Sequence, residues 1–454
     1  MKEIAIIGGG FSGTLTAVQL LRQARTPVHV TVYEKRPERL GKGLAYSTTE
    51  NCHLLNVPAK GMSALAEQPD HFLRWAEASQ GSGAPTGIDV HADAFLPRAM
   101  YGRYVQALLH DTVRAHAGRH RYSLVPHEVL DLHQTGQGVT LSLDGSESAH
   151  TGRVVLALGN FPPADPLAAD GKHWYHPTPW DENLAERIIA SSSCAIIGSG
   201  LTMLDVVLML QDRQYGGTVH VVSRRGLLPQ PHHPGCASPD DAVLPHGQPL
   251  PALVRTIREI AVRHARAGGH WQGVMDWLRP HNAELWRGLS MQERRTFVRH
   301  VRRYWENHRH RAAPAVHARF HRLVETGKVV LHRGRVGAMT AAPHGVELEL
   351  RGPSGDADIL RADHVINCTG AECDYRKIPN SLVRRLLEQG LTSCDPLGFG
   401  IVASAQGALV NADGKASNTL FTIGPPMKGA LWETTAVPEL RVQAQALAAR
   451  LLRD

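Results

Sequence analysis

A glycine-rich turn near the start of the chain constrains the fold more than any other feature. The apolar run 2–7 predicts a strand, and it leads directly into Gly8-Gly9-Gly10-Phe11-Ser12-Gly13, a G-x-G-x-x-G pattern between a strand and a helix. The first glycine permits a tight turn, the second lets backbone N–H groups approach a pyrophosphate, and the third lets the helix pack closely on the strand. The chain is therefore expected to begin with a dinucleotide-binding unit whose helix N-terminus faces the phosphates.

An acidic residue follows at the spacing that such a unit needs. The second predicted strand, residues 28–33, ends at Glu34, which comes 21 residues after Gly13. A carboxylate at this point accepts hydrogen bonds from a ribose. The pattern, its strand-to-helix context and this acid together favour a bound dinucleotide over a glycine-rich turn without a ligand.

A second turn of the same kind occurs in the middle of the chain. The apolar run 194–197 leads into Gly198-Ser199-Gly200-Leu201-Thr202-Met203, in which Met203 replaces the third glycine, so the helix is expected slightly farther from the strand. The next predicted strand, 218–222, is followed by Ser223-Arg224-Arg225 in place of an acid. Guanidinium groups pair well with phosphate, which favours NADPH over NADH. The alternative is that both arginines belong to a solvated loop.

The similarity between the two halves extends beyond the glycines. Each turn is followed by three strand-like runs (122–125, 128–133 and 138–143, then 328–332, 334–340 and 345–350), which suggest a three-stranded meander. Each set then leads to a buried strand that ends in glycine, at 153–159 and 364–370. An internal repeat of this size indicates two related units, and two such units suggest two dinucleotides that meet and exchange a hydride.

With these motifs in place, the chain resembles the flavoprotein oxidoreductases that have two dinucleotide-binding domains. This group includes flavin-containing and N-hydroxylating monooxygenases and glutathione-reductase-like enzymes. The segments Gly-Lys-Gly-Leu-Ala-Tyr at 41–46, Asn-Cys-His-Leu-Leu-Asn-Val-Pro at 51–58, and 431–440 are similar to bacterial FAD/NAD(P)-binding proteins of this group. The resemblance covers nearly the whole chain.

The resemblance implies an α/β fold of two Rossmann-like, glutathione-reductase-like domains. The FAD-binding domain is expected to be discontinuous, over 1–180 plus 365–454. The NADPH-binding domain is expected over 190–364, with a helical insertion at about 235–327.

The resemblance also implies where the two cofactors bind. Asn56 can hydrogen-bond the flavin ring or the nicotinamide, or it can cap a turn before Pro58; Arg98 can contact cofactor or substrate, or be a helix-start cation. Many relatives have Gly-Asp where this chain has Gly424-Pro425. The expected FAD residues are Gly8, Gly10, Phe11, Ser12, Gly13, Glu34, Lys35, Ala45, Asn56, Val57, Arg98, Val129, Ala157, Leu158, Gly159, Gly424, Pro425 and Thr435, and the expected NADPH residues are Gly198, Ser199, Gly200, Leu201, Thr202, Ser223, Arg224, Arg225, Thr369 and Gly370.

About a hundred residues between Arg225 and Lys328 exceed what two dinucleotide folds require. Runs 250–267 and 283–311 have helical periodicity, and four of the eight tryptophans fall in this part of the chain. One interpretation is a substrate lid in which His308 or an arginine binds an acidic substrate. The other is a basic helix packed through its Trp and Leu face, or a dimer contact. No residue stands out as catalytic, and the adjacent His232 and His233, among prolines, suggest a loop more than a metal site.

Composition and charge restrict the expected location and partners of the protein. The formal net charge is +7, which polyanionic cofactors explain without nucleic acid. The six cysteines form no C-x-x-C, and no run of 18 apolar residues occurs. Cys368 and Cys373 have the spacing of a redox disulfide but lie far from the expected flavin. We expect a cytoplasmic protein that binds NADPH and a small-molecule substrate, with no nucleic-acid or membrane partner, and with a homodimer as one possibility.

Three functions are compatible with these features. The first is an NADPH-dependent monooxygenase that hydroxylates a small nucleophilic, amine-type substrate. The second is an NADPH-dependent reductase or dehydrogenase that acts on an organic acceptor. The third is a flavin-containing sensor or partner-binding protein. Fold alone does not separate them.

Overall fold

A computed structural model describes residues 1–79, 88–165, 167–169, 171–240 and 242–453. The first half of the fold is built on a six-stranded sheet with the strand order β16-β17-β7-β1-β2-β3. All neighbouring strands are parallel except β16 and β17. The strands are β1 (Lys2–Ile7), β2 (Val28–Tyr33), β3 (Arg121–Val125), β7 (Arg153–Leu156), β16 (Ala408–Val410) and β17 (Ala416–Thr422).

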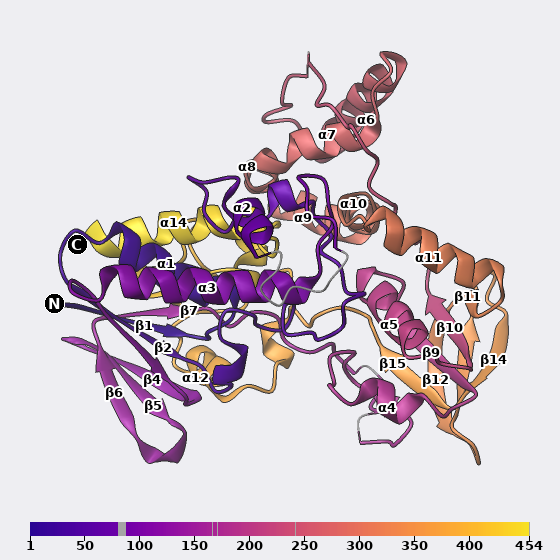
Figure 1. The fold of residues 1–454 in the computed structure, drawn as a ribbon, viewed down its shortest axis with the longest axis horizontal. Coiled ribbons are helices and arrows are strands. Elements are labelled where there is room, and N and C mark those ends of the chain that lie inside the picture. Colours follow the sequence, from indigo (N-terminus) through magenta and orange to yellow (C-terminus); the bar gives the residue numbers. More distant parts are fainter. Residues whose placement is uncertain (80–87, 166, 170, 241, 454) are drawn as a thin grey trace.

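Three helices cover one face of this sheet. Helix α1 (Phe11–Gln23) packs between α3 (Arg98–His116) and α14 (Val437–Arg453), so the last helix of the chain lies against the first (Figure 1). The apolar side chains of β1 and β2 are buried between the layers, which explains why β1 is a nearly continuous apolar run.

The second half repeats this plan. A five-stranded parallel sheet has the order β11-β10-β9-β15-β8, and α5 and α11 pack against each other beside it. Its elements are β8 (Tyr175–His176), β9 (Ser193–Ile197), α5 (Leu201–Asp212), β10 (Thr218–Ser223), α11 (Pro314–Glu325), β11 (Val329–Arg333) and β15 (His364–Asn367). The expected α/β fold with two Rossmann-like units is confirmed.

The composition of the two meanders differs from the prediction. The runs 122–125 and 328–332 are β3 and β11, which join the parallel sheets at their edges. Each meander gains a later strand instead, because a half-buried edge strand and a meander strand have the same alternating pattern. The meanders are β4 (Val129–Thr135), β5 (Gly138–Leu143) and β6 (Ser148–Thr151), and β12 (Arg335–Ala341), β13 (Val346–Arg351) and β14 (Ala357–Ala362).

The second sheet also extends beyond the predicted limits of its domain, 190–364. Strand β15 continues to Asn367, and β8 pairs with it from residues 175–176. The expected first domain, 1–180 plus 365–454, includes both of these segments. The sequence does not indicate which sheet they join, because strand pairing depends on residues distant in the sequence.

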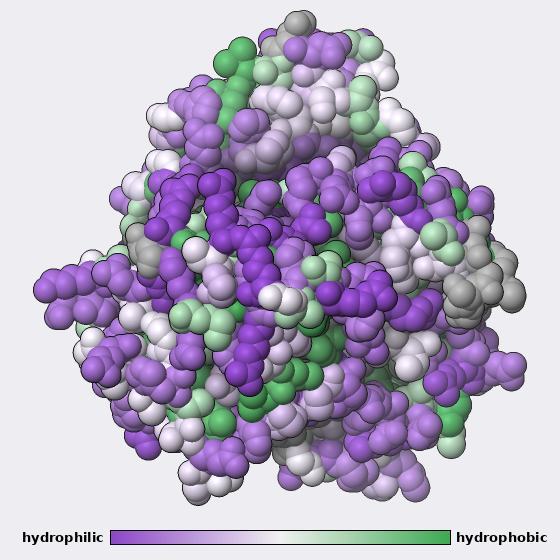
Figure 2. All heavy atoms as spheres, turned by 60° about the vertical axis from the view of Figure 1, so that its left-hand side comes forward, coloured by the Kyte–Doolittle hydropathy of each residue, from purple (hydrophilic) through white to green (hydrophobic). Residues whose placement is uncertain are grey.

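The region between the two halves of the second unit is helical, as predicted, but the long helix expected at 283–311 is broken. Ser290 caps a new helix with its side chain on the N–H of Glu293, and a π-helical turn follows at Phe297–Val301. The helices are α6 (Leu250–Arg266), α7 (Trp271–Leu278), α8 (Asn282–Gly288), α9 (Met291–Thr296) and α10 (Arg302–Arg309). They rise above the two sheets in Figure 1, and α6 and α7 form the top of Figure 2.

The described part of the chain also contains several shorter helices and turns. They are α2 (His71–Ala78), α4 (Leu184–Ile188), α12 (Ser381–Glu388) and α13 (Lys428–Leu431), with 3-10 turns at Pro37–Arg39, Ala59–Gly61, Asp144–Ser146, Arg279–His281, Tyr375–Lys377 and Pro425–Met427. None of the described helices combines the length and the apolar character that a membrane crossing requires.

Candidate functional site

The first glycine-rich turn has the geometry of a phosphate-binding loop. Gly8 has a φ of +102°, a conformation that other residues rarely adopt. A side chain on Gly13 would overlap the carbonyl oxygen of Gly8, so α1 approaches β1 as closely as the pattern predicts. Gly10 precedes α1, and no side chain caps this helix. Its first N–H groups therefore point at the space where a pyrophosphate would bind.

Glu34 lies beside this turn, at the end of β2. Its Oε2 accepts a hydrogen bond from the backbone N–H of Gly9 at 2.8 Å, and its Oε1 accepts one from the N–H of Arg36 at 2.9 Å. The carboxylate is thus held at the edge of the loop, where a ribose would extend from the pyrophosphate.

The segment 41–46 packs directly on the loop. The N–H of Gly41 donates to the carbonyl of Gly9 at 2.8 Å, and the Tyr46 ring meets Phe11 edge-on at 5.8 Å between centroids. Phe11 is 7% exposed, so its side chain anchors the helix and only its backbone is available to a ligand. Ala45 is exposed beside it.

The C-terminal part of the chain returns to the same place. The Ser12 hydroxyl lies 3.0 Å from the position that a Cβ on Gly424 would take. Thr434 donates from its hydroxyl to the carbonyl of Gly424 at 2.9 Å, while Thr435 is exposed just before α14. The structure thus brings residues 12, 424 and 434 together at the start of α1.

Other residues of the expected FAD site make contacts within the protein. The Lys35 ammonium pairs with Glu128 at 2.8 Å, and the Val129 side chain is buried in the core. The N–H of Ala157 donates to the carbonyl of Ile7 at 2.8 Å, and Gly159 faces open space. Gly159 therefore leaves room for a ligand just past the end of β7, and Leu158 lies between Ala157 and this glycine.

Arg98 has a role that the sequence did not indicate. Its guanidinium forms a bidentate ion pair with Asp205 on α5, at 2.8 and 3.2 Å, and also donates to the carbonyl of Leu54 at 3.0 Å. The two charged side chains are 13% and 10% exposed. Arg98 thus joins the first unit to the helix of the second glycine-rich turn, and these bonds occupy most of the donors that a cofactor would use.

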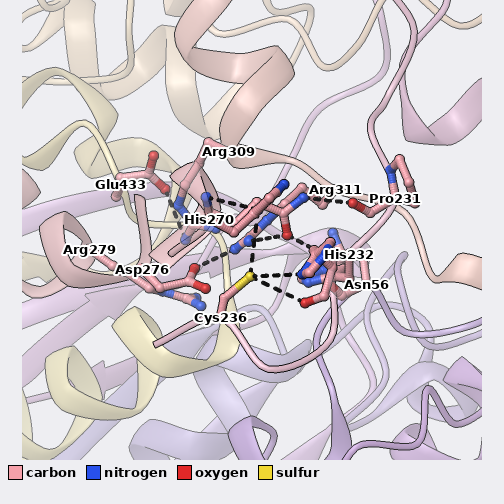
Figure 3. A network of polar contacts seen from close by, with 12 residues as sticks. Asn56, Pro231, His232, Cys236, His270, Asp276, Arg279, Arg309, Arg311 and Glu433 are labelled. Carbon is pink, nitrogen blue, oxygen red and sulfur yellow. Dashed lines mark hydrogen bonds and ion pairs between the residues drawn. The ribbon is translucent and has the colours of Figure 1, made fainter. Parts of the chain in front are cut away.

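The segment Asn56-Val57 is tied to the loop that follows β10. The Asn56 carbonyl accepts a hydrogen bond from His232 Nε2 at 3.0 Å, and the His232 ring packs on Phe95 (Figure 3). Burial, with the nearby charge of Arg311 second, lowers the pKa of His232 to about 4. His232 is therefore a neutral donor that holds the chain where the resemblance places the flavin.

This histidine is expected to make the protein less stable in acid. Above pH 6.5 His232 is neutral in both folded and unfolded chains, so it adds no pH dependence there. Between pH 6.5 and about 4, the unfolded chain binds a proton that the folded chain does not, and the free energy of unfolding falls. The urea midpoint of His232→Gln should decline less steeply than that of the wild type from pH 7 to 5. The exposed His344, changed to Gln, should decline like the wild type.

The second glycine-rich turn repeats the first with one difference. Gly198 has a φ of +112°, Gly200 precedes α5 without a side-chain cap, and Met203 is fully buried where the third glycine would be. Ser199 donates from its hydroxyl to the carbonyl of Leu227 at 2.6 Å. Leu201 and Thr202 form the first turn of α5. Thr369 donates from its N–H and hydroxyl to Asn367, and Gly370 faces open space as Gly159 does.

A group of arginines surrounds the end of β10. Ser223 accepts a hydrogen bond from the N–H of Gly226 at 3.1 Å, and Arg224 and Arg225 are exposed. Ser223 pairs in register with Arg333 at the end of β11, so a third exposed guanidinium lies next to the predicted phosphate site. Nothing near Arg333 in the sequence indicates this position, because only the pairing of β10 with β11 brings the residue there.

The insertion is joined to the C-terminal segment by buried charges and aromatic rings. Arg309 lies 3.6 Å from Glu433 (Figure 3). Arg279 pairs with Glu439 at 2.5 Å, and Trp305 Nε1 donates to Glu433 at 3.0 Å. These contacts fix the insertion above the start of α14. The insertion and the C-terminal Trp432 also line an open pocket of about 290 Å³, whose walls include Trp271, Trp286 and Trp305.

His233, Cys236 and His270 lie close enough for their ligand-type atoms to be within 4.8 Å of one another. The Nδ1 of His270 already accepts a hydrogen bond from the N–H of Gln272 at 3.3 Å. Burial lowers the pKa of His270, followed by the charges of His233 and Arg311, so a guanidinium acts on the same ring. A cation is disfavoured by both, and the expectation of no metal stays a prediction.

Comparison with known proteins gives this arrangement a context. Residues 5–161 match the family model described as FAD-NAD(P)-binding. The cofactor-binding class inferred from the glycine-rich turns is thereby confirmed.

One curated relative and two solved structures are similar over longer stretches. The uncharacterized protein YdhS of Escherichia coli K12 is 28% identical over 240 residues, which cover 50% of this chain but only 43% of that protein. The ornithine hydroxylase PvdA of Pseudomonas aeruginosa aligns over 100% of this chain and 99% of its own, with a TM-score of 0.64 and 16% identity. DfoA, the FAD-bound cadaverine monooxygenase of Erwinia amylovora, aligns over 99% and 94%, with a TM-score of 0.69 and 12% identity. At these identities the two solved structures establish a shared fold.

Proposed function

We propose that this chain is an FAD-dependent, NADPH-oxidising monooxygenase that hydroxylates a nucleophilic, amine-type substrate. The observation that carries the proposal is that the Arg98–Asp205 ion pair joins two units with unlike glycine-rich turns. Glu34 lies beside the first turn, whereas Ser223 and three arginines lie beside the second. The full-length similarity in fold to the ornithine and cadaverine monooxygenases supports the choice of reaction.

The residues present fit the two cofactors. The uncapped start of α1 and Glu34 suit the pyrophosphate and ribose of FAD, and the uncapped start of α5 and the exposed arginines suit NADPH. Gly159 and Gly370 leave open space along both paths. When bound, FAD supplies the electron transfer and the reaction with oxygen, while the protein supplies orientation and electrostatics.

Residues outside the two glycine-rich turns set the relative position of the two units and limit the access of water to the site. The Arg98–Asp205 pair sets how the two units face each other, which decides whether two bound dinucleotides meet. The insertion, held by Arg279 on Glu439 at the start of α14, covers the site from above and keeps water from the reacting groups.

The proposal is tested by steady-state turnover of the FAD-loaded protein with NADPH and a panel of primary amines. A monooxygenase consumes oxygen and NADPH in step with the formation of a hydroxylamine, and releases little hydrogen peroxide. NADPH oxidation that proceeds anaerobically with an organic acceptor, and yields no hydroxylated amine in air, would identify a reductase instead. A flavin that NADPH leaves oxidised would point to a sensor.

The arginine group should determine the choice of nicotinamide cofactor. Arg224→Glu with Arg225→Ala removes two cations and adds an anion beside the 2′-phosphate, so KM for NADPH should rise roughly 10- to 100-fold while KM for NADH stays unchanged. Arg333→Glu should raise KM for NADPH in the same direction. Arg255→Glu, which makes the same charge change on the exposed side of α6, is the control. An unaltered preference in the double variant would place the 2′-phosphate elsewhere.

A further inference from the structure

The pocket in the insertion has the walls of a ligand-binding site. Its volume of about 290 Å³ lies near the lower end of the range found for small-ligand pockets. Helices α6, α7, α8 and α10 contribute most of its lining, and Trp432 adds to it from the C-terminal segment. Four of the chain's eight tryptophans line it, together with Phe297 and aliphatic side chains of α6. Walls of this kind gain free energy when water leaves them, so they favour the apolar body of a ligand.

The open side of this pocket carries a positive charge. Three of the lining residues are exposed and therefore lie where the pocket meets solvent: Arg258 on α6, and Tyr304 and His308 on α10. Among the described residues, no aspartate or glutamate lines the pocket. Charge of one sign beside low-dielectric walls attracts ligands of the opposite sign.

The guanidinium of Arg258 is free to pair with an anion at this opening. No ion pair or hydrogen bond joins it to another residue in the described part of the chain. Arg302 on the neighbouring α10, by contrast, already pairs with Glu306 at 2.9 Å. A guanidinium presents a planar fork of N–H donors that matches the two oxygens of a carboxylate. Arg258 therefore offers a carboxylate a partner at the edge of the apolar walls.

Two further arginines add to the positive potential at the opening. The Arg303 guanidinium lies over the Tyr304 ring, 4.7 Å from its centroid. A hydrogen bond from Arg303, and then the charges of Arg303 and Arg225, lower the pKa of the Tyr304 phenol. The charge of Arg225 thus reaches the opening from the loop after β10. The tryptophan faces attract a cation as well, so the preference for an anion rests on the arginines at the opening.

We propose that this pocket binds amphipathic carboxylates. The apolar body of the ligand lies against the tryptophans and α6, and its carboxylate pairs with Arg258 at the opening. The inference goes beyond the proposed function, because it assigns a binding site to the insertion whether or not the flavin acts on the bound compound. Of the two interpretations of the insertion, the pocket supports the one in which an arginine binds an acidic ligand.

Equilibrium dialysis of the FAD-loaded protein against radiolabelled octanoate tests this assignment. Octanoate should bind saturably, because its chain leaves water and its carboxylate gains a guanidinium. Each CH₂ added between hexanoate and octanoate should tighten binding by up to about fourfold. Octanol and octylamine have the same chain without the carboxylate, and as unlabelled competitors both should displace octanoate more weakly than octanoate itself does.

Two substitutions on α6, each with a control on the same helix, locate the site. Ala261→Trp fills the pocket and should weaken octanoate binding by about tenfold or more. Val262→Trp, at an exposed position outside the lining, should bind like the wild type. Arg258→Gln should remove the preference for octanoate over octanol, and Arg255→Gln, also exposed and outside the lining, should keep it. Near-ultraviolet circular dichroism of the tryptophans shows that each variant retains the fold of the insertion.

Three results would each overturn the inference. One is a wild-type protein that binds no octanoate saturably, and another is octanoate binding that Ala261→Trp leaves unchanged. The third is displacement by octylamine at lower concentrations than by octanoate, in the wild type and in Arg258→Gln alike, which would identify an aromatic site for amines. Oxidation of NADPH in the presence of primary amines is measured separately, so that failure of this site is distinguished from failure of the proposed reaction.

Discussion

Replacing Arg98 with alanine is expected to lower the free energy of unfolding by about 3–5 kcal/mol. The substitution leaves the Asp205 carboxylate 10% exposed and without its bidentate partner, at the contact between the two dinucleotide-binding units. It also removes the donor to the carbonyl of Leu54. Urea unfolding followed by circular dichroism measures the loss, and the rate of FAD reduction by NADPH should fall with it because the units lose their fixed orientation.

A double variant that removes both charges separates the effect of an unpaired carboxylate from the loss of the ion pair itself. Arg98→Met with Asp205→Leu removes both charges and should cost less than Arg98→Ala alone, because no buried charge is left unpaired. Arg213→Ala is the matched control, since its ion pair with Glu50 joins the same two units but its side chain is 48% exposed. That control should change stability little. Equal losses in Arg98→Ala and Arg213→Ala would contradict the assigned role.

Reversing the charge at Glu34 is expected to weaken FAD binding about 100-fold or more. The carboxylate is held by the N–H groups of Gly9 and Arg36, and Glu34→Arg loses both these bonds and the acceptors for the ribose. The absorbance ratio of bound flavin to protein after purification, and a titration of the apoprotein with FAD, measure the effect.

Two further variants make the Glu34 experiment specific. Glu34→Gln keeps one acceptor and should fall between the wild type and Glu34→Arg. Glu38→Arg makes the same charge change at an exposed position four residues later and should leave FAD binding unaltered. A Glu34→Arg protein as yellow as the wild type would show that the first unit does not hold FAD in the proposed way.

The local sequence pattern predicted those structural elements whose conformation is set by residues nearby in the sequence. Both glycine-rich turns, the strands before them and the helices after them lie where the spacing placed them. Glu34 and the arginines after Ser223 fall at the ends of β2 and β10, because the end of a strand is visible in the sequence as the end of an apolar run. The fold class followed from these features.

Local sequence pattern could not predict which side chains from distant parts of the chain contact each other. Asp205 is one helix turn past a glycine-rich motif, and nothing near it in the sequence indicates that Arg98, 107 residues earlier, pairs with it. Arg333 joins the phosphate site only through the parallel pairing of β10 and β11. Strands β3 and β11 were assigned to the wrong sheets for the same reason.

The sequence by itself determined the two dinucleotide-binding units and the contrast between acid and arginine at their ribose positions, because each rests on backbone geometry within about 30 residues. Only the tertiary structure decided that the insertion breaks into short helices around a tryptophan-lined pocket. It also decided that the Asn282 amide is buried without a hydrogen-bond partner among the described residues. An amide in a helical sequence is usually a surface residue, and the burial of Asn282, which is 4% exposed, depends on the tertiary packing of the insertion.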